Sequence, residues 1–215
     1  EHVGGAGVTN GALSSKTWWE LSREASSFRK NLKRYNIKAP SIAYKEIQAE
    51  VLRAVEERKG MLEEHMELLK SSPQANLLTF KSGTARLVTQ HEIEITNGLR
   101  KEVVSGDYII LATGSRPRHL PELPIDEKFV MTSEGIESME DFPESMVIVG
   151  AGVIGCEYAT IFSGFGKTKV HLIDKGARIL PFEDEDVVKV IERNMENNGV
   201  LIHRNSRLIR MEIKN

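Results

Sequence analysis

The sequence predicts an α/β protein built on a parallel sheet, and three observations support this prediction. In the last third of the chain, short apolar strands and longer helical segments alternate in the order strand, helix, strand, helix, strand. The first of these strands, 146–150, runs directly into a glycine-rich turn. The second strand, 169–174, ends on the acidic residue Asp174. Because each helix must return the chain to the start of the sheet, neighbouring strands should be parallel.

The remaining elements of this region follow from the same pattern. Helices are expected over 152–165 and 183–198, and a third strand over 200–205.

The first half of the chain predicts two helices. One spans 16–32, where Trp18, Trp19 and Leu21 are followed by charged residues. The second spans 42–69, although Gly60 weakens the pattern near its middle. Its apolar residues fall on one face: Ile47, Val51, Val55, Leu62, Met66 and Leu69. That face either packs against a core or forms a coiled-coil contact with a partner, and the sequence leaves both readings open.

Three β segments are expected between these helices and the final region. They are 77–89, 91–96 and 102–114. The second alternates polar and apolar residues, as a strand with one wet face does, and Asn97 and Gly98 supply turn chemistry after it. The third ends in a continuous apolar strand that stops at Gly114. The three prolines of 115–124 predict an extended crossing between domains.

Composition excludes several classes of protein. The 215 residues include 29 basic and 31 acidic ones, and 40% of the chain is hydrophobic. This balance gives no electrostatic case for nucleic-acid binding, and no apolar run approaches the roughly 20 residues of a membrane span. The single cysteine, Cys156, excludes an internal disulfide and favours an intracellular reducing compartment, cytoplasm or mitochondrial matrix. With neither a signal peptide nor an initial Met, we expect a piece of a longer protein.

The glycine-rich turn has the spacing G-x-G-x-x-G, formed by Gly150, Gly152 and Gly155. The motif follows an apolar strand, opens a helix, and has Asp174 about 20 residues further on, as dinucleotide-binding turns do. Gly150 permits the sharp turn, Gly152 lets the backbone approach a pyrophosphate, and Gly155 lets the helix pack on the sheet.

The helix start, including Val153 and Ile154, should receive the phosphate charge. Asp174 can accept both ribose hydroxyls of adenosine and would repel a 2′-phosphate, which favours NAD(H) over NADP(H). Lys175 and Arg178 lie close enough to soften that preference. The alternative is a glycine turn that binds nothing.

The segment IILATGSRP, followed some way on by this motif, resembles the class I pyridine nucleotide–disulfide oxidoreductases, in particular those of the dihydrolipoamide dehydrogenase type. The resemblance implies a partial FAD-binding Rossmann-like domain over 1–124, whose first strand would lie upstream. It further implies a connecting segment over 125–145 and a partial NAD(P)-binding domain over 146–215. It also implies FAD contacts at these residues: Gly83, Thr84, Ala85, Thr113 and Gly114.

The opening segment GGAGVTNGALSSK resembles the family's GGTCVNVGCIPSK, whose two cysteines form a redox disulfide beside the flavin. Here Gly7 and Ala12 stand at the cysteine positions, and Ser14 stands at that of the proline. The resemblance also implies FAD contacts at Gly5, Ala6 and Lys16. In the family this lysine pairs with a glutamate beside the reactive flavin nitrogen, which corresponds to Glu157. By itself, Lys16 reads as a surface residue at a helix start.

Two hypotheses for function follow. The first is an FAD- and NAD(H)-dependent oxidoreductase without the disulfide, which passes electrons to a small-molecule acceptor such as a quinone, another nicotinamide, oxygen or a dye. The hard chemistry of hydride exchange belongs to the cofactors and needs no thiol. The second is a non-catalytic structural or partner-binding subunit of the same ancestry. Either form would be a homodimer or a subunit of a larger complex, and no metal site is expected.

Overall fold

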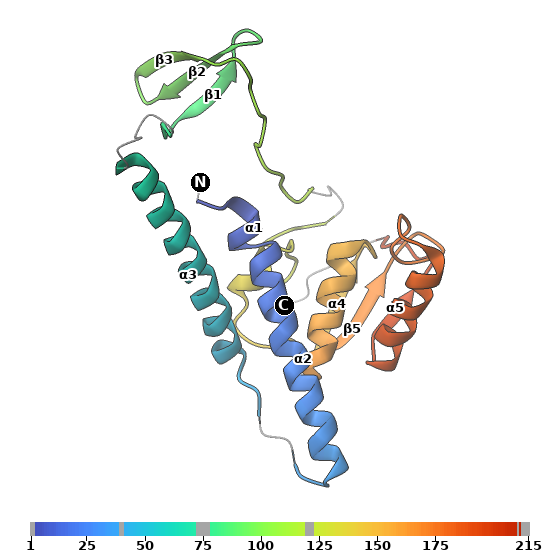
Figure 1. Ribbon diagram of the computed structural model, residues 1–215. Coiled ribbons are helices and arrows are strands. Elements are labelled where there is room, and N and C mark those ends of the chain that lie inside the picture. The colour runs from blue at the N-terminus through green and yellow to red at the C-terminus, as the bar shows by residue number, and fades with distance from the viewer. Residues whose placement is uncertain (1–2, 39–40, 72–77, 119–122, 210, 212–215) are drawn as a thin grey trace. The chain divides into compact units, whose positions relative to one another are not determined.

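The computed structural model describes residues 3–38, 41–71, 78–118, 123–209 and 211 (Figure 1). The chain forms two compact units. The first unit comprises Glu1–Arg58 and Arg116–Asn215, and the second comprises Lys59–Ser115. The domain division expected at 1–124, 125–145 and 146–215 follows sequence motifs and remains a prediction.

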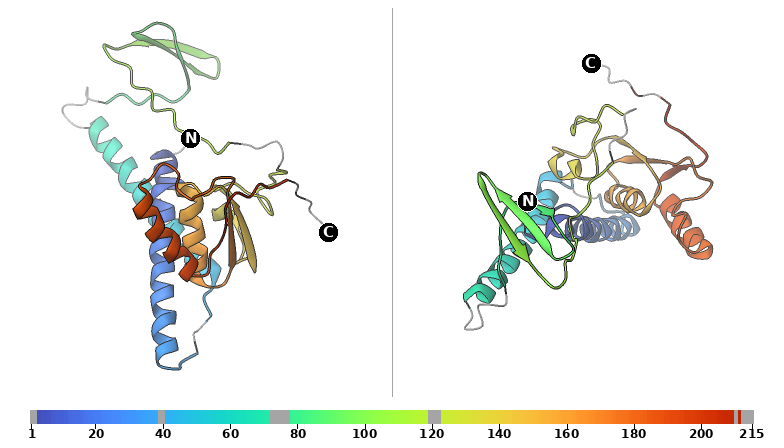
Figure 2. Two further views of the ribbon diagram at one scale, coloured as in Figure 1. Left: turned by 90° about the vertical axis from the view of Figure 1, so that its right-hand side faces the viewer. Right: turned by 90° about the horizontal axis from the view of Figure 1, so that it is seen from above.

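The first unit contains the predicted parallel sheet. Its strands are β4 (Ser145–Val149), β5 (Lys169–Ile173) and β6 (Leu201–His203), in the order β4-β5-β6, and both pairs are parallel. The helices that connect them are α4 (Val153–Phe165) and α5 (Glu185–Asn197), which lie on the same face of the sheet (Figure 2). The strand–helix alternation and the predicted α/β fold class are therefore confirmed.

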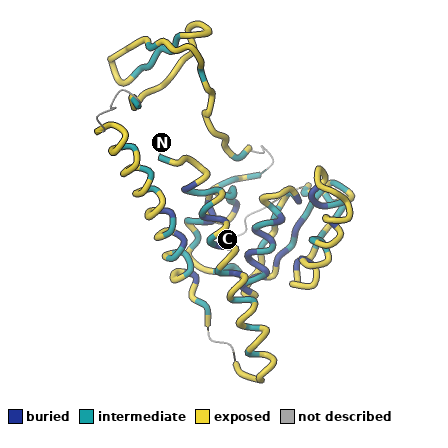
Figure 3. The backbone as a smooth tube through the Cα atoms, in the orientation of Figure 1, coloured by how far each residue is buried: buried dark blue, intermediate teal, exposed yellow. Residues whose placement is uncertain are grey.

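The core of this unit lies between the sheet and its helices. Alternate residues of β5 point into it, so that Val170 and Leu172 are fully buried, as is Phe162 of α4 (Figure 3). The period of two along β5 and of 3.6 along α4 explains why both apolar sets reach one layer.

A long helix, α2 (Ala12–Arg34), packs against α4, and the short helix α1 (Gly5–Thr9) precedes it. The predicted helix 16–32 is thus right in its centre and begins too late. The Ser15 amide donates to the Gly11 carbonyl at 3.0 Å, which closes a helical turn ahead of Lys16. Trp18 joins the core, with its ring 5.3 Å from that of Tyr44 and 6.1 Å from that of Phe165.

Helix α3 (Tyr44–Ser71) corresponds to the predicted helix 42–69, and Gly60 does not interrupt it. Val51 and Val55 are buried, which confirms that the first half of its apolar face packs against a core. Leu69, near the other end of that face, is 46% exposed. None of the described helices is both long enough and apolar enough to cross a membrane.

The second unit contains an antiparallel three-stranded sheet. Its strands are β1 (Thr84–Leu87), β2 (Glu92–Asn97) and β3 (Arg100–Ser105). Of the two expected turn residues, only Gly98 takes a positive φ, of 59°. Parts of the expected segments 77–89 and 115–124 lie outside the described residues.

The apolar strand predicted up to Gly114 is wrong, because residues 107–114 form no strand. Tyr108 and Ile110 are 93% and 89% exposed. A continuous apolar run becomes a strand when it has neighbours on both edges and cover on both faces. Within the described ranges no strand pairs with this segment, so its side chains have nothing to bury against.

Candidate dinucleotide site and the Lys16–Glu157 pair

The turn between β4 and α4 is built in a way that only glycine allows. Gly150 has a φ of 107°, in the region that favours glycine, and its amide donates to the Ile173 carbonyl at 2.9 Å. A Cβ on Gly155 would lie 1.9 Å from the Gly150 carbonyl oxygen and 3.4 Å from the Ile148 side chain. Gly155 therefore sets the close approach of the helix to the strand.

Gly152 differs from both neighbours, because a Cβ there would meet nothing within 4 Å and its φ is −78°. The fold does not require glycine at this position. It is the residue before the first turn of α4, where amide groups lack helical partners. Val153 and Ile154, which open the helix, are 64% and 59% exposed. This open helix start fits a pyrophosphate, which would draw on both the free amides and the helix dipole.

Asp174 ties the glycine-rich turn to the end of β5. Its Oδ2 accepts from the Ala151 amide at 2.7 Å, and its Oδ1 accepts from the Gly176 amide at 2.6 Å. A carboxylate has about four acceptor sites, so two bound amides leave room for ribose hydroxyls. Arg178 donates to the carbonyls of Pro181 and Glu183, so its guanidinium is engaged elsewhere in this loop.

Replacing Asp174 with Asn should affect both fold and ligand preference. One amide donor loses its acceptor, so the free energy of unfolding should fall by about 1–2 kcal/mol. Loss of the negative charge should also narrow the ratio of NADH to NADPH affinity about tenfold. Urea unfolding and fluorescence titration with both nucleotides measure these effects. An unchanged ratio would contradict the assignment of Asp174 to the ribose, and Asp141→Asn is a control at an exposed acidic site.

Lys16 and Glu157, 141 residues apart, form an ion pair between Nζ and Oε1. The Ser15 hydroxyl donates to the same carboxylate oxygen at 3.0 Å, and the Lys16 ammonium lies 3.4 Å from that hydroxyl. The Lys16 side chain is 63% exposed and that of Glu157 is 18% exposed. The structure thus brings together the two residues named from the motif, and Ser15, which the sequence reasoning overlooked, completes the group. The role of the pair beside a flavin stays a prediction.

The two positions that correspond to the family's cysteines are close in the chain and open. Gly7 lies within α1, Ala12 begins α2, and both are exposed. Cys156 is 5% exposed, and its Sγ lies 3.5 Å from the Ala151 carbonyl. Burial, with smaller contributions from Asp174 and Glu192, raises the pKa of this thiol to about 11. Cys156 is therefore a protonated packing residue and supplies no redox thiol at neutral pH.

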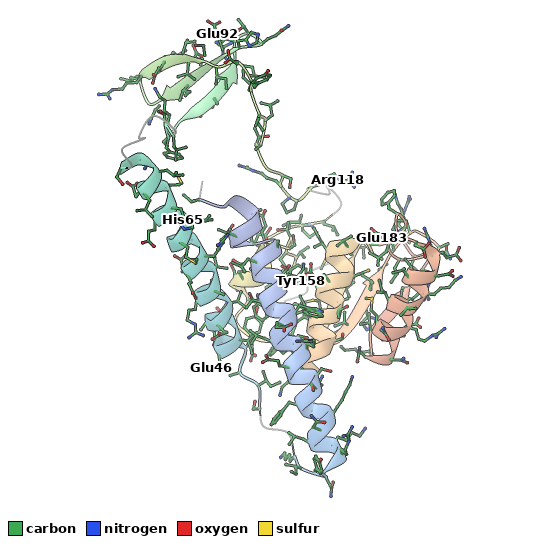
Figure 4. All side chains as sticks on the ribbon, in the orientation of Figure 1. Glu46, His65, Glu92, Arg118, Tyr158 and Glu183 are labelled. Atoms are coloured by element: carbon green, nitrogen blue, oxygen red, sulfur yellow. The ribbon has the colours of Figure 1, made fainter. Side chains whose placement is uncertain are left out.

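A second acidic group, Glu137, lies in the short 3-10 helix η2 (Gly135–Ser138) and was not anticipated from the sequence. Its Oε1 and the Ser14 Oγ are both buried without a hydrogen-bond partner among the described residues. Burial raises the pKa of the Glu137 carboxyl. Burial, followed by Glu137 and Glu157, raises the pKa of Tyr158 on α4 to about 12. Figure 4 labels this residue. No spacing in the sequence signals this cluster.

Glu137 makes stability depend on pH. The pKa of this carboxyl is higher in the folded chain than in the unfolded one, so binding its proton stabilises the fold. This contribution to stability is complete below the pKa of the unfolded state and is lost as the pH rises through the pKa of the folded state. We expect Glu137→Gln, which cannot lose that proton, to gain stability relative to the wild type as the pH rises above the ordinary carboxyl range and through the raised pKa of Glu137. Urea midpoints at several pH values measure this difference. Glu134→Gln, at an exposed neighbouring position, should show no such trend.

The predicted FAD residues divide between the two units. The first unit holds Gly5, Ala6 and Lys16, and the second holds Gly83, Thr84, Ala85, Thr113 and Gly114. Gly83 has a structural role of its own, since its φ is 156° and a Cβ would lie 2.7 Å from the Thr96 carbonyl oxygen. The FAD set remains a prediction. In the described part of the chain, no group of three or more potential metal ligands occurs.

A parallel strand–turn–helix with three glycines, braced by an acid from the next strand, defines a dinucleotide-binding α/β protein. The comparisons with known proteins agree. The profile of one family, pyridine nucleotide-disulphide oxidoreductase, matches residues 3–214. The chain belongs to this family, whose members use FAD and NAD(H).

Individual relatives are longer than this chain. It is 29% identical over 210 residues to a dihydrolipoyl dehydrogenase of Bacillus subtilis, and this alignment covers 98% of the chain and 45% of that protein. It is 32% identical over 202 residues to a soluble pyridine nucleotide transhydrogenase of Mycobacterium bovis, covering 92% and 42%. The solved structure of LpdA from Mycobacterium tuberculosis has the same fold, with a TM-score of 0.81 at 22% identity, covering 98% and 45%. The chain therefore spans less than half of each relative.

Proposed function

We propose that this chain forms part of a flavin-dependent NAD(H) oxidoreductase that exchanges hydride between nicotinamide and FAD without a protein disulfide. The observation that carries the proposal is the Lys16–Glu157 ion pair, which is formed although the neighbouring thiol positions hold Gly7 and Ala12. When bound, FAD supplies the hydride-accepting chemistry.

The residues of the chain supply binding and charge. The open start of α4 at Gly152 would hold the pyrophosphate of NAD(H), and Asp174 would fix its adenosine ribose. Lys16 would stabilise negative charge on a reduced flavin ring. Glu157 and Ser15 would keep the Lys16 ammonium in position, because one carboxylate oxygen contacts both.

Among the acceptors that remain open, we propose a second nicotinamide nucleotide. The similarity to a soluble pyridine nucleotide transhydrogenase supports this choice. Exchange between two nicotinamides through one flavin needs only successive binding and alignment, so the lost thiols would not be required. A quinone, oxygen or a dye would need the same first half-reaction.

An anaerobic titration with NADH, on the longest form of the protein, tests the proposal. We expect bound flavin to bleach with one equivalent of NADH, without the long-wavelength band of a thiolate–flavin contact. Subsequent addition of an NAD analogue should restore the flavin colour. Bound flavin that NADH does not reduce, or a preparation that binds no flavin, would favour the alternative of a non-catalytic subunit.

The assembly and location are part of the same proposal. We propose a homodimer, or a subunit of a larger complex, in a reducing compartment, which the single cysteine favours. Light scattering of the longest form of the protein measures its mass in solution and so tests the proposed assembly.

A further inference from the structure

A strongly basic hollow lies at the edge of the first unit that is remote from the glycine-rich turn. Its volume is about 650 Å³. Lys169 begins β5 and Glu144 directly precedes β4, so the hollow meets the amino-terminal ends of the strands. Gly150 follows the carboxyl-terminal end of β4, at the opposite edge. In Figure 1, α4 and α5 run in one direction and β5 runs in the opposite direction.

The lining carries a surplus of positive charge. Five cationic residues line the hollow against one acid, Glu144, and the cationic ones are Arg29, Lys30, Lys33, Lys167 and Lys169. The four lysines are exposed, and none pairs with a carboxylate of any residue that the structure describes. The chain as a whole has a net charge of −2, so this concentration of positive charge is local.

Helix ends account for two of these cations and leave the other three unexplained. Lys33 lies in the last turn of α2, where it complements the helix dipole. The Arg29 guanidinium donates to the Gly164 carbonyl in the last turn of α4, where a cation complements the helix dipole. Backbone amides close the end of α5: Gly199 donates to the Glu196 carbonyl at 2.9 Å, and Val200 to that of Met195 at 3.0 Å. The other three lysines, Lys30, Lys167 and Lys169, are therefore not needed to complete a helix end.

Two hydrogen-bond donors in the same lining also lack acceptors. Thr168 is 7% exposed, and its Oγ1 has no partner within the described chain. The Nε of Arg29 is likewise buried and unpartnered there. Buried donors are normally satisfied, so two such groups beside four unpaired lysines indicate a missing acceptor. Both atoms are closed to solvent, so an oxyanion in the hollow would supply this acceptor only after a small shift of the side chains that cover them.

We propose that the basic hollow, formed by Arg29, Lys30, Lys33, Lys167, Thr168 and Lys169, binds a small molecule that carries at least two phosphate groups. A single phosphate carries about 1.5–2 negative charges at pH 7, so two or more are needed to balance four lysines. The volume lies within the roughly 300–1,000 Å³ typical of small-molecule sites. This inference does not depend on the proposed oxidoreductase activity.

Isothermal titration of the longest form of the protein with tripolyphosphate, at roughly physiological salt, tests the proposal. We expect one site, with inorganic phosphate binding about tenfold more weakly. The double variant Lys30→Gln with Lys167→Gln should weaken tripolyphosphate binding about tenfold or more. The control, Lys128→Gln with Lys189→Gln, removes the same charge from the same unit outside the hollow and should change affinity less than about twofold.

A third variant, Thr168→Val, keeps the shape of the side chain and removes the hydroxyl. It should weaken binding about fivefold, while the unfolding midpoint of the free protein should stay the same or rise, because the buried hydroxyl has no partner there. Amide shift changes on titration should centre on 163–169 and 26–33, an assay that holds even where the double variant is unstable. Three results would each contradict the proposed site. They are an equal loss of tripolyphosphate affinity in the control variant, displacement of tripolyphosphate by saturating NAD, and amide shift changes centred on 150–155.

Discussion

Replacing Lys16 with Met should slow the reduction of bound flavin by NADH about a hundredfold, the typical effect of removing one group that stabilises developing charge. Lys16 contacts Glu157 and Ser15, so the substitution also leaves the Glu157 carboxylate without its cation. Both effects oppose a gain of negative charge near the pair. Stopped-flow measurement of flavin absorbance under anaerobic conditions gives the rate directly.

The matched control for this variant is Lys189→Met. Lys189 also forms an ion pair in the first unit, with Glu185 at 3.1 Å, and its side chain is 58% exposed, close to the 63% of Lys16. Both lysines are exposed at the surface, where an ion pair contributes little to stability, so neither variant should unfold the protein. Equal rates for Lys16→Met and the wild type would remove the pair from the reaction and leave it as a surface contact.

The second large effect concerns two glycines of the G-x-G-x-x-G motif. Replacing Gly155 should reduce stability, whereas replacing Gly152 should reduce the affinity for NAD(H). Gly155→Ala places a Cβ 1.9 Å from the Gly150 carbonyl oxygen, so α4 must move away from β4. Overpacking of this kind should lower the free energy of unfolding by about 2–3 kcal/mol. In Gly152→Ala the new Cβ meets nothing within 4 Å, and the change costs only the difference between glycine and alanine at a helix N-cap. Its free energy of unfolding should therefore fall by no more than about 1 kcal/mol.

The affinity for NAD(H) separates the functional role of Gly152 from a structural one. A methyl group at Gly152 would stand where the pyrophosphate approaches, so Gly152→Ala should weaken NADH binding about tenfold or more in a stable protein. Thermal unfolding and NADH fluorescence titration of both variants give the two quantities. Unaltered affinity in Gly152→Ala would indicate a glycine turn that binds no dinucleotide.

The region from β4 to β6 could be predicted from sequence because each signal there is local. The strand period, the glycine spacing and the position of Asp174 each depend on residues that are close together in the sequence. The apolar run that ends at Gly114 carried an equally clear local signal, and its prediction as a strand was wrong. A strand needs a partner for its backbone groups, and partnership is a property of the rest of the chain.

The residues of the candidate site also differ in whether a local sequence signal could predict them. Lys16 and Glu157 could be named from motifs, but only the folded chain shows Ser15 on the same carboxylate oxygen. Glu137, Thr168 and the basic hollow had no local signal, because their properties arise from burial and from neighbours distant in sequence. Burial changes the pKa of a carboxyl only once other elements exclude water from it.

The sequence by itself determined the order of the elements, the glycine-rich turn with its acid, and the absence of a cysteine pair at Gly7 and Ala12. These are properties of residue type and spacing, which act over one turn or one strand. The tertiary structure decided which helix face is buried, where Asp174 directs its two oxygens, and which charges remain unpaired at the hollow. Those outcomes depend on contacts between α2, α4 and the sheet, which no local pattern specifies.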